Sequence, residues 1–137
     1  MGGVIAALAG SRTEANLRRA FASATLASRR YGALSEQAEA AGYPRAADVF
    51  RACAEARAVQ AEGHLSRLEP CDGTNGTAYN VRLAIMGQAH ACDDAYPAMA
   101  RTARNEGFFD IADWFEVRAE AGRSVAGRFR RVLETLL

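Results

Sequence analysis

The sequence predicts an all-α protein, a four-helix bundle built from two repeated helical hairpins. Three observations lead to this fold class. Apolar residues recur at helical spacing, runs of helix-breaking residues divide the chain into four segments, and the second half repeats the first. Half of the 137 residues are hydrophobic, which is enough for one compact domain to bury a core without disulfides or metal.

The first half carries start and stop signals for two helices. Ser11 followed by Glu14 forms a capping box, which predicts a helix that begins here and continues until Gly42. The stretch "GYPRAADVF" then places Pro44 in the first turn of a second helix. That helix is expected to run to about residue 69, because Pro70 cannot continue it.

The second half is bounded by the loop "PCDGTNG", the one place where several breakers follow each other. We expect Thr77 to cap a third helix, and "NEGFF" around Gly107 to separate it from a fourth helix that reaches the C-terminus. The predicted organisation is an N-terminal arm (1–10) and a helical domain (11–137), divided into a hairpin (11–69), a linker (70–77) and a second hairpin (78–137).

The two halves align as copies of one hairpin. "LRRAF" matches "VRLAI", "AAGYPRAADVFRACAEA" matches "RNEGFFDIADWFEVRAEA", and "HLSRLE" matches "RFRRVLE". The register shifts by one residue between Gly87 and Gly107, where "DAYPAMA" carries an extra position beside Pro97. Two explanations remain open: a π-bulge, which is often found at functional sites, or a kink caused by the proline.

Charge and cysteine content exclude several classes of function. The chain has 17 basic and 16 acidic residues, so we expect no binding of nucleic acid or of an anionic membrane surface. Cys53, Cys71 and Cys92 form no CxxC pair, and an odd number suits a reducing cytoplasm better than a disulfide framework. The opening "MGGVIAALAG" is too short to span a membrane and has no basic start, so we expect neither a membrane span nor a secretion signal.

Several motifs occur in the order found in one known family. "TEANLRRAF", "RRY", "EAAGYPRAADVF", "TAYNVRLAIMG", "YPAMARTARNEGFFDIADWF" and "AEA" resemble the ferritin-like domain of rubrerythrins, over about residues 11 to 136. No rubredoxin domain with paired CxxC motifs follows, so the chain is similar to the short, single-domain members. The resemblance implies a ferritin-like bundle.

The resemblance also implies where metal would bind. Such bundles hold two metal ions with a Glu from each of two helices and a Glu-x-x-His from each of the other two, and rubrerythrins add one more Glu. Carried over residue by residue, every one of these positions has lost its ligand. The positions are Ala24, Arg57, Gln60, Gln88, Ala91, Gly122 and Val125. We therefore expect no di-iron cofactor and no metal.

In this register Arg57 faces the interior with Gln60 and Gln88. A buried guanidinium needs a partner, because an isolated interior charge costs several kcal/mol. The partner could be an acidic residue, for which Asp93, Asp94 and Glu120 are candidates, or it could be a bound anion. Arg57 could instead replace the metal structurally and hold the helices together.

A residual site could be built from the other reactive side chains near these positions. Cys53 and Cys92 lie one turn from Arg57 and Gln88, and a nearby cation would activate a thiol. His90 neighbours Gln88, and Tyr31 and Tyr96 match tyrosines that lie beside the rubrerythrin metal site. Each also has an ordinary explanation, because free cysteine and inward tyrosine are common core residues. Glu55 and Glu120, equivalent in the two repeats, are expected at the surface.

The linker predicts a dimer. In a ferritin-like bundle the second and third helices run parallel, so their connection must travel the length of a helix of about 39 Å. About eight residue steps reach at most about 28 Å. Either the bundle has simple up-down-up-down order, or the second hairpin packs on a partner chain, and we predict this domain-swapped homodimer.

Three functions follow from these observations. The first is a metal-free pseudoenzyme, a non-catalytic protein-binding or scaffolding subunit that could belong to a larger assembly. The second is an oxidative-stress oxidoreductase or peroxidase with an unconventional metal or thiol site. The third is a small-anion binding protein that uses the emptied site around Arg57. The sequence favours the first, a protein without enzymatic activity.

Overall fold

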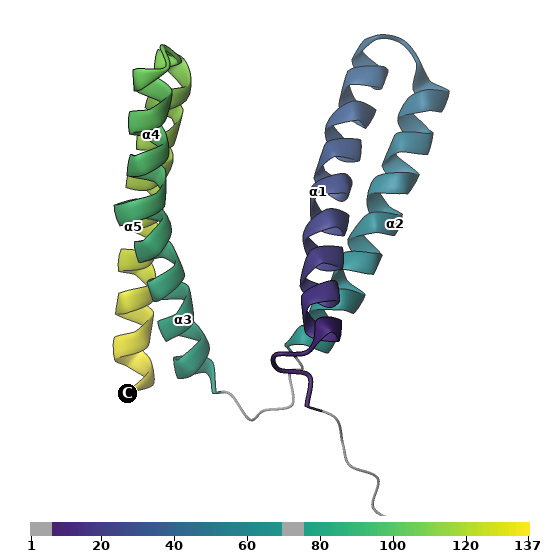
Figure 1. The fold of residues 1–137 in the computed structure, drawn as a ribbon. Coiled ribbons are helices and arrows are strands. Elements are labelled where there is room, and N and C mark those ends of the chain that lie inside the picture. Colours follow the sequence, from purple (N-terminus) through teal and green to yellow (C-terminus); the bar gives the residue numbers. More distant parts are fainter. Residues whose placement is uncertain (1–6, 70–75) are drawn as a thin grey trace, which may run out of the picture. The chain divides into compact units, whose positions relative to one another are not determined.

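The computed structural model describes residues 7–69 and 76–137, and the chain divides into two compact units, Met1–Cys71 and Asp72–Leu137. Each unit is a hairpin of helices that pack side by side (Figure 1). The described residues contain no β-strand, so the all-α prediction is confirmed. Most of the predicted arm (1–6) and of the predicted linker (70–75), with Cys71, lies outside the described residues.

The first hairpin consists of α1 (Arg12–Ala40) and α2 (Pro44–Leu68). Ser11 is the N-cap of α1 as predicted, because the backbone N–H of Glu14 donates to Ser11 Oγ at 3.0 Å. The other half of the capping box differs, since Glu14 Oε1 accepts from the N–H of Gly10 at 3.3 Å and not from that of Ser11. Pro44 is the first residue of α2, where its missing N–H costs no helical hydrogen bond. The local signals in the sequence therefore define both helices.

The second hairpin packs one interrupted helix against one long helix. The interrupted helix consists of α3 (Thr77–Ala89), the π-helix η1 (His90–Ala95) and α4 (Tyr96–Asn105), and its partner is α5 (Phe109–Leu136). Four long helical segments therefore form two hairpins, as the sequence predicts. None of the helices in 7–69 and 76–137 is both long and apolar enough to cross a membrane.

The start of α3 differs from the prediction. Thr77 was expected to be the cap, but Gly76 is the N-cap and Thr77 is the first helical residue. Gly76 has an extended backbone, and glycine offers no side-chain oxygen to the free N–H groups of the first turn. The second hairpin therefore begins without the side-chain cap that Ser11 gives the first.

Both hairpins turn in the same way. Gly42 and Gly107 have φ angles of +85° and +89°, a conformation that side chains with a Cβ rarely adopt. After each glycine, the next backbone N–H reaches back five residues: Tyr43 to Ala38 O at 2.9 Å, and Phe108 to Ala103 O at 2.8 Å. These are Schellman motifs, and they satisfy the last carbonyl groups of α1 and α4.

A seam of small side chains joins the helices in each hairpin. Ala47 and the equivalent Ala112 are both completely buried, and Ser35 Oγ donates to Ala47 O at 2.9 Å. Alanine at the contact lets two helix axes approach closely. The buried residues are Ala24, Ser35, Ala47 and Ala61 in the first hairpin, and Val81, Cys92, Ala100, Ala103, Ala112, Ala119 and Ala126 in the second.

Equivalent aromatic pairs flank the two seams. Tyr31 stacks on Phe50 with ring centroids 6.2 Å apart, and Tyr96 stacks on Phe115 at 6.0 Å. The interplanar angles, 24° and 26°, are almost the same. The repeat read from the sequence is therefore also a repeat of side-chain packing, and both tyrosines act here as half-buried core residues.

The π-helix lies where the sequence carries its extra residue. At its end the N–H of Tyr96 donates to Ala91 O, five residues back, and Pro97 follows directly. Of the two explanations left open by the sequence, the π-bulge is confirmed. Pro97 contributes to it, because proline has no N–H and cannot continue the normal α-helical pattern.

Candidate functional site

In the first hairpin, the positions mapped as metal ligands are occupied by Ala24, Arg57 and Gln60. Ala24 is buried in the seam, and Arg57 is half-buried on α2. Arg57 Nη1 donates to Gln60 Oε1 at 3.0 Å, one turn further along the helix. None of the ion pairs in the described part of the chain includes Arg57, so its described hydrogen-bond partner is a neutral amide.

In the second hairpin, Gln88 on α3 lies close to Gly122 on α5. A methyl group placed on the Cα of Gly122 would overlap Cys92 Sγ and would lie 2.9 Å from Gln88 Oε1. The thiol of Cys92 lies 3.8 Å from the same oxygen, a long and weak hydrogen bond. Gln88, Cys92 and Gly122 therefore form one packed cluster, with no space for a side chain at position 122.

Arg123 holds the π-helix against α5. Its Nη2 donates to Cys92 O at 2.8 Å, and its Nε donates to Asp93 Oδ1 at 3.2 Å. Asp93 was one of the acidic residues considered as a partner for Arg57, and in the structure it pairs with Arg123 inside its own hairpin. Asp94, another candidate, lies 3.7 Å from His90 Nδ1 across one turn, and both side chains are exposed.

The thiols and remaining carboxylates are placed as follows. Cys92 is 1% exposed, Cys53 is half-buried, and both are free. They lie in different hairpins. Glu55 and Glu120 are both exposed, as expected for surface residues.

Arg104 carries the one pKa displacement that stands out among the described residues. Hydrogen bonds to Glu116 (2.8 Å) and Asp113 (3.1 Å) raise the pKa of its guanidinium above the usual value, so the arginine stays charged. The three side chains are exposed at the end of the second hairpin, away from the mapped positions. We therefore assign this cluster to the pairing of α4 with α5. Exposed ion pairs such as these contribute little to the free energy of unfolding.

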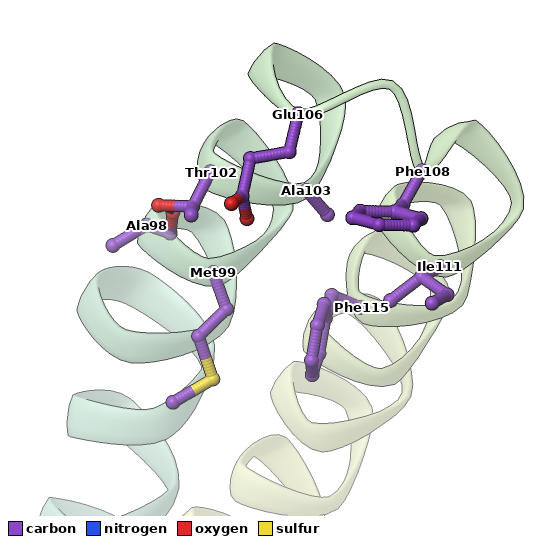
Figure 2. A pocket seen from close by; sticks show the side chains of 8 residues that line it. All are labelled: Ala98, Met99, Thr102, Ala103, Glu106, Phe108, Ile111 and Phe115. Carbon is purple, nitrogen blue, oxygen red and sulfur yellow. Dashed lines mark hydrogen bonds between the residues drawn. The ribbon is translucent and has the colours of Figure 1, made fainter.

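An apolar pocket lies beside the turn between α4 and α5. Its volume is about 400 Å³, and Figure 2 shows Met99, Phe108, Ile111 and Phe115 around it, with Glu106 at its edge. Ala98, Thr102 and Ala103 complete its wall. It contains none of the mapped positions, and the sequence did not predict it.

The side chains at the mapped positions do not fit a di-iron centre. Among residues 7–69 and 76–137 no cluster of three or more His, Cys, Asp or Glu could hold a metal ion. The seven positions offer two amide oxygens, from Gln60 and Gln88, and one cation, Arg57, with no carboxylate or imidazole. Two iron ions require several negatively charged ligands, whereas the positive guanidinium of Arg57 repels metal ions.

The described chain thus consists of two helical hairpins, the second of which contains a π-helix. The positions mapped from the family resemblance carry apolar, amide and cationic side chains. The family profile described as Rubrerythrin matches residues 15–133, so the chain belongs to the rubrerythrin family.

Curated relatives agree with this assignment. The chain is 34% identical to a rubrerythrin of Porphyromonas gingivalis over 134 residues, which is 90% of this chain and 67% of the relative. It is 32% identical to a rubrerythrin of Nitratidesulfovibrio vulgaris, covering 89% of this chain and 69% of that protein. It is 29% identical to Rubrerythrin-1 of Clostridium acetobutylicum, covering 94% and 73%. The resemblance to rubrerythrins and the ferritin-like fold expected from it are therefore confirmed.

Sequence reasoning missed Arg123 and the packing of Cys92 onto Gly122. One signal for Arg123 was present, because Pro97 removes a backbone donor from the helix in which the extra residue lies. The position equivalent to Arg123 in the first repeat is Ala58, and no extra residue is present there. An arginine found only beside the insertion could have been recognised as the missing donor.

Proposed function

We propose that this rubrerythrin-family protein is a non-catalytic binding or scaffolding subunit that has lost the di-iron ligands. The observation that carries the proposal is the donor set at the mapped positions: a cation at Arg57, amides at Gln60 and Gln88, and a glycine at 122 whose side-chain space is filled by Cys92. Residues of this kind do not bind iron, because the cation repels it and no carboxylate is present. The helices around these positions nevertheless form.

The decisive measurement is metal content. The purified protein would be incubated anaerobically with ferrous iron, desalted and analysed by elemental mass spectrometry, and peroxide consumption would be followed in parallel. We expect essentially no iron and no turnover, with the helical circular dichroism unchanged. About two irons per chain would overturn the proposal and return the protein to the peroxidases. Peroxide turnover without iron that is lost in a Cys53→Ser, Cys92→Ser variant would support the thiol alternative.

The apolar surface that each hairpin leaves open supports packing against a second hairpin. Each hairpin buries mainly small side chains and leaves large apolar ones exposed, including Leu26, Val49 and Val59 in the first and Trp114 and Val117 in the second. Exposed apolar surface of this kind usually marks contact with another surface. The pocket of Figure 2 adds Met99, Phe108 and Ile111 to it. The proposal therefore includes a homodimer in which the second hairpin packs on the first hairpin of a second chain, in a reducing cytoplasm that suits free thiols.

The swapped dimer is tested by lengthening the linker. Light scattering should give twice the chain mass of 14.7 kDa for the natural protein. Inserting about 20 Gly and Ser residues after Glu69 gives a flexible connection of about 25 Å on average, with a far longer reach when extended. The lengthened chain should then close on itself and become a monomer. A lengthened chain that stays dimeric would exclude the swap, and a natural protein that is monomeric would exclude the dimer.

A second candidate function is binding of a small anion at Arg57. It is favoured by one observation: Arg57 is half-buried, and its described hydrogen-bond partner is the neutral Gln60. Carboxylates and phosphates match the fork of donors on a guanidinium. Inorganic phosphate and acetate would be titrated by calorimetry into the natural protein, Arg57→Ala and the control Arg51→Ala, whose arginine is exposed and pairs with Asp48. Loss of binding in Arg57→Ala alone would support the candidate, and absence of binding to the natural protein would reject it.

A further inference from the structure

The carbonyl oxygen of Cys92 lacks the backbone donor that a regular helix supplies. In an α-helix the donor would be the N–H of Tyr96, but that group bonds to Ala91 O. In a π-helix it would be the N–H of the next residue, which is Pro97 and has none. Arg123 Nη2 donates to Cys92 O at 2.8 Å, so a side chain from α5 supplies the missing donor.

The same cysteine also fills the space beside the glycine next to Arg123. Cys92 is buried, and its sulfur would overlap the first carbon of a side chain at position 122. Other helical glycines differ: a Cβ on Gly127 would meet only the end of Arg131, at 3.8 Å, and one on Gly87 would meet nothing within 4 Å. Among the helical glycines described in this hairpin, Gly122 is therefore the one at which an added side chain would have to displace a neighbour.

We propose that Gly122 and Arg123 together lock the π-helix onto α5 through Cys92. Gly122 accepts the thiol, and Arg123 binds the carbonyl of the same residue and the carboxylate of Asp93. The Asp93 pair is exposed and contributes little, whereas the bond to Cys92 O satisfies a part-buried acceptor that would otherwise be left free.

The lock has a consequence for the mapped metal ligands. A carboxylate introduced at position 122 would have to displace the Cys92 thiol, because the first carbon of any side chain there overlaps it. This inference concerns packing alone and goes beyond the proposed function, since it holds whatever the protein binds. Packing in the second hairpin thus disfavours a metal ligand at position 122.

The first test asks whether the effect of Gly122→Ala on the thermal midpoint changes sign when the Cys92 thiol is removed. Gly122→Ala in the natural protein should lower the thermal midpoint by about 5 °C, because overpacking outweighs the helix propensity gained. In a Cys92→Ala background the same change should raise the midpoint by about 2 °C, since the space is then free and Gln88 can move its flexible amide. Gly127→Ala is the matched control and should raise the midpoint slightly in both backgrounds.

The outcomes of this test are clear. A Gly122→Ala protein that behaves like Gly127→Ala would overturn the proposal. If Gly122→Ala fails to fold, the thermal midpoint of the single variant Cys92→Ala can still be compared with that of the double variant Cys92→Ala, Gly122→Ala. A higher midpoint in the double variant would support the proposal. A double variant less stable than Cys92→Ala alone would show that something other than the thiol excludes a side chain at 122.

The second test examines Arg123. Hydrogen exchange of the amides of His90–Ala95, measured by mass spectrometry on the folded chain, should become about tenfold faster in Arg123→Gln. The control Arg130→Gln, an exposed arginine of α5, should leave these amides unchanged. In a Pro97→Ala background, where a backbone N–H can reach Cys92 O, the effect of Arg123→Gln should shrink. Equal exchange in Arg123→Gln and Arg130→Gln would refute the role given to Arg123.

Discussion

The two hairpins share one scaffold and differ at the mapped ligand positions. Both have a small-residue seam, a glycine turn with positive φ and a tyrosine stacked on a phenylalanine. At equivalent positions, however, the first carries Arg57 and the second carries Gly122. The first repeat therefore has a long cationic side chain at this position, and the second has no side chain.

The helices that pack against these positions, α1 and the interrupted helix of the second hairpin, also differ. In α1 the helix is regular, and Ser28 Oγ donates across the seam to Ala54 O at 2.8 Å. The equivalent residue in the second hairpin is Cys92, which lies in the π-helix and receives a hydrogen bond from Arg123 at its carbonyl. In the first hairpin a side chain of α1 donates to the backbone of α2, and in the second a side chain of α5 donates to the backbone of the π-helix. Both hydrogen bonds lie beside buried alanines, Ala24 and Ala61 in the first hairpin and Ala119 and Ala126 in the second.

The strongest way to break this equivalence is to overfill the seam. Ala47→Leu and Ala112→Leu should each destabilise the protein by about 3 kcal/mol, because both positions are completely buried and a larger side chain must push the helices apart. The exposed control Ala121→Leu should change stability by less than about 0.5 kcal/mol. Urea unfolding followed by circular dichroism would measure all three. Clearly unequal costs at 47 and 112 would show that the two seams are not built alike.

The turns test the comparison next. Gly42→Ala and Gly107→Ala should each cost about 1 to 2 kcal/mol, because a Cβ is strained at φ angles of +85° and +89°. The same replacement at Gly87, which lies inside α3 with open space around it, should instead stabilise the helix by about 0.5 to 1 kcal/mol. Thermal unfolding would show whether stability falls in the two turn variants and rises in the Gly87 variant. A turn that accepts alanine without loss would indicate that the hairpin can close through another backbone conformation.

Ser35 provides a sharper test, because the second hairpin already contains the variant. Ser35 is equivalent to Ala100, and its hydroxyl donates to Ala47 O at 2.9 Å in a buried position. Ser35→Ala should cost about 1 kcal/mol, the typical contribution of one hydrogen bond. The exposed Ser23→Ala is the control and should be neutral or slightly favourable. No loss in Ser35→Ala would mean that the first seam packs as well without the hydroxyl, as the second does.

Local features of the fold could be predicted from the sequence, because each depends on a few neighbouring residues. Glycine and proline marked the turns, and Ser11 with Glu14 marked the first helix start. The extra residue beside Pro97 marked an irregularity in the helix, although the sequence left a π-bulge and a proline kink open. The mapped ligand positions came from the family resemblance. The bond from Arg123 to Cys92 O and the overlap between Cys92 and Gly122 could not be predicted, because they depend on the distance and rotation between two helices. For the same reason Asp93 was considered as a partner for Arg57, whereas it pairs with Arg123.

The smallest expected effect concerns the two helix starts. Ser11 caps α1 with its side chain, whereas α3 begins after Gly76, which has none. Gly76→Ser should therefore stabilise the second hairpin by a few tenths of a kcal/mol, and Ser11→Ala should cost about 1 kcal/mol, because an N-cap hydroxyl satisfies a free N–H of the first turn.

Hydrogen exchange at the first turns of α1 and α3 would resolve differences of this size better than global unfolding. Slower exchange in α3 of the Gly76→Ser protein would show that the start of α3 is limited by its cap; unchanged exchange would show that this turn opens for another reason.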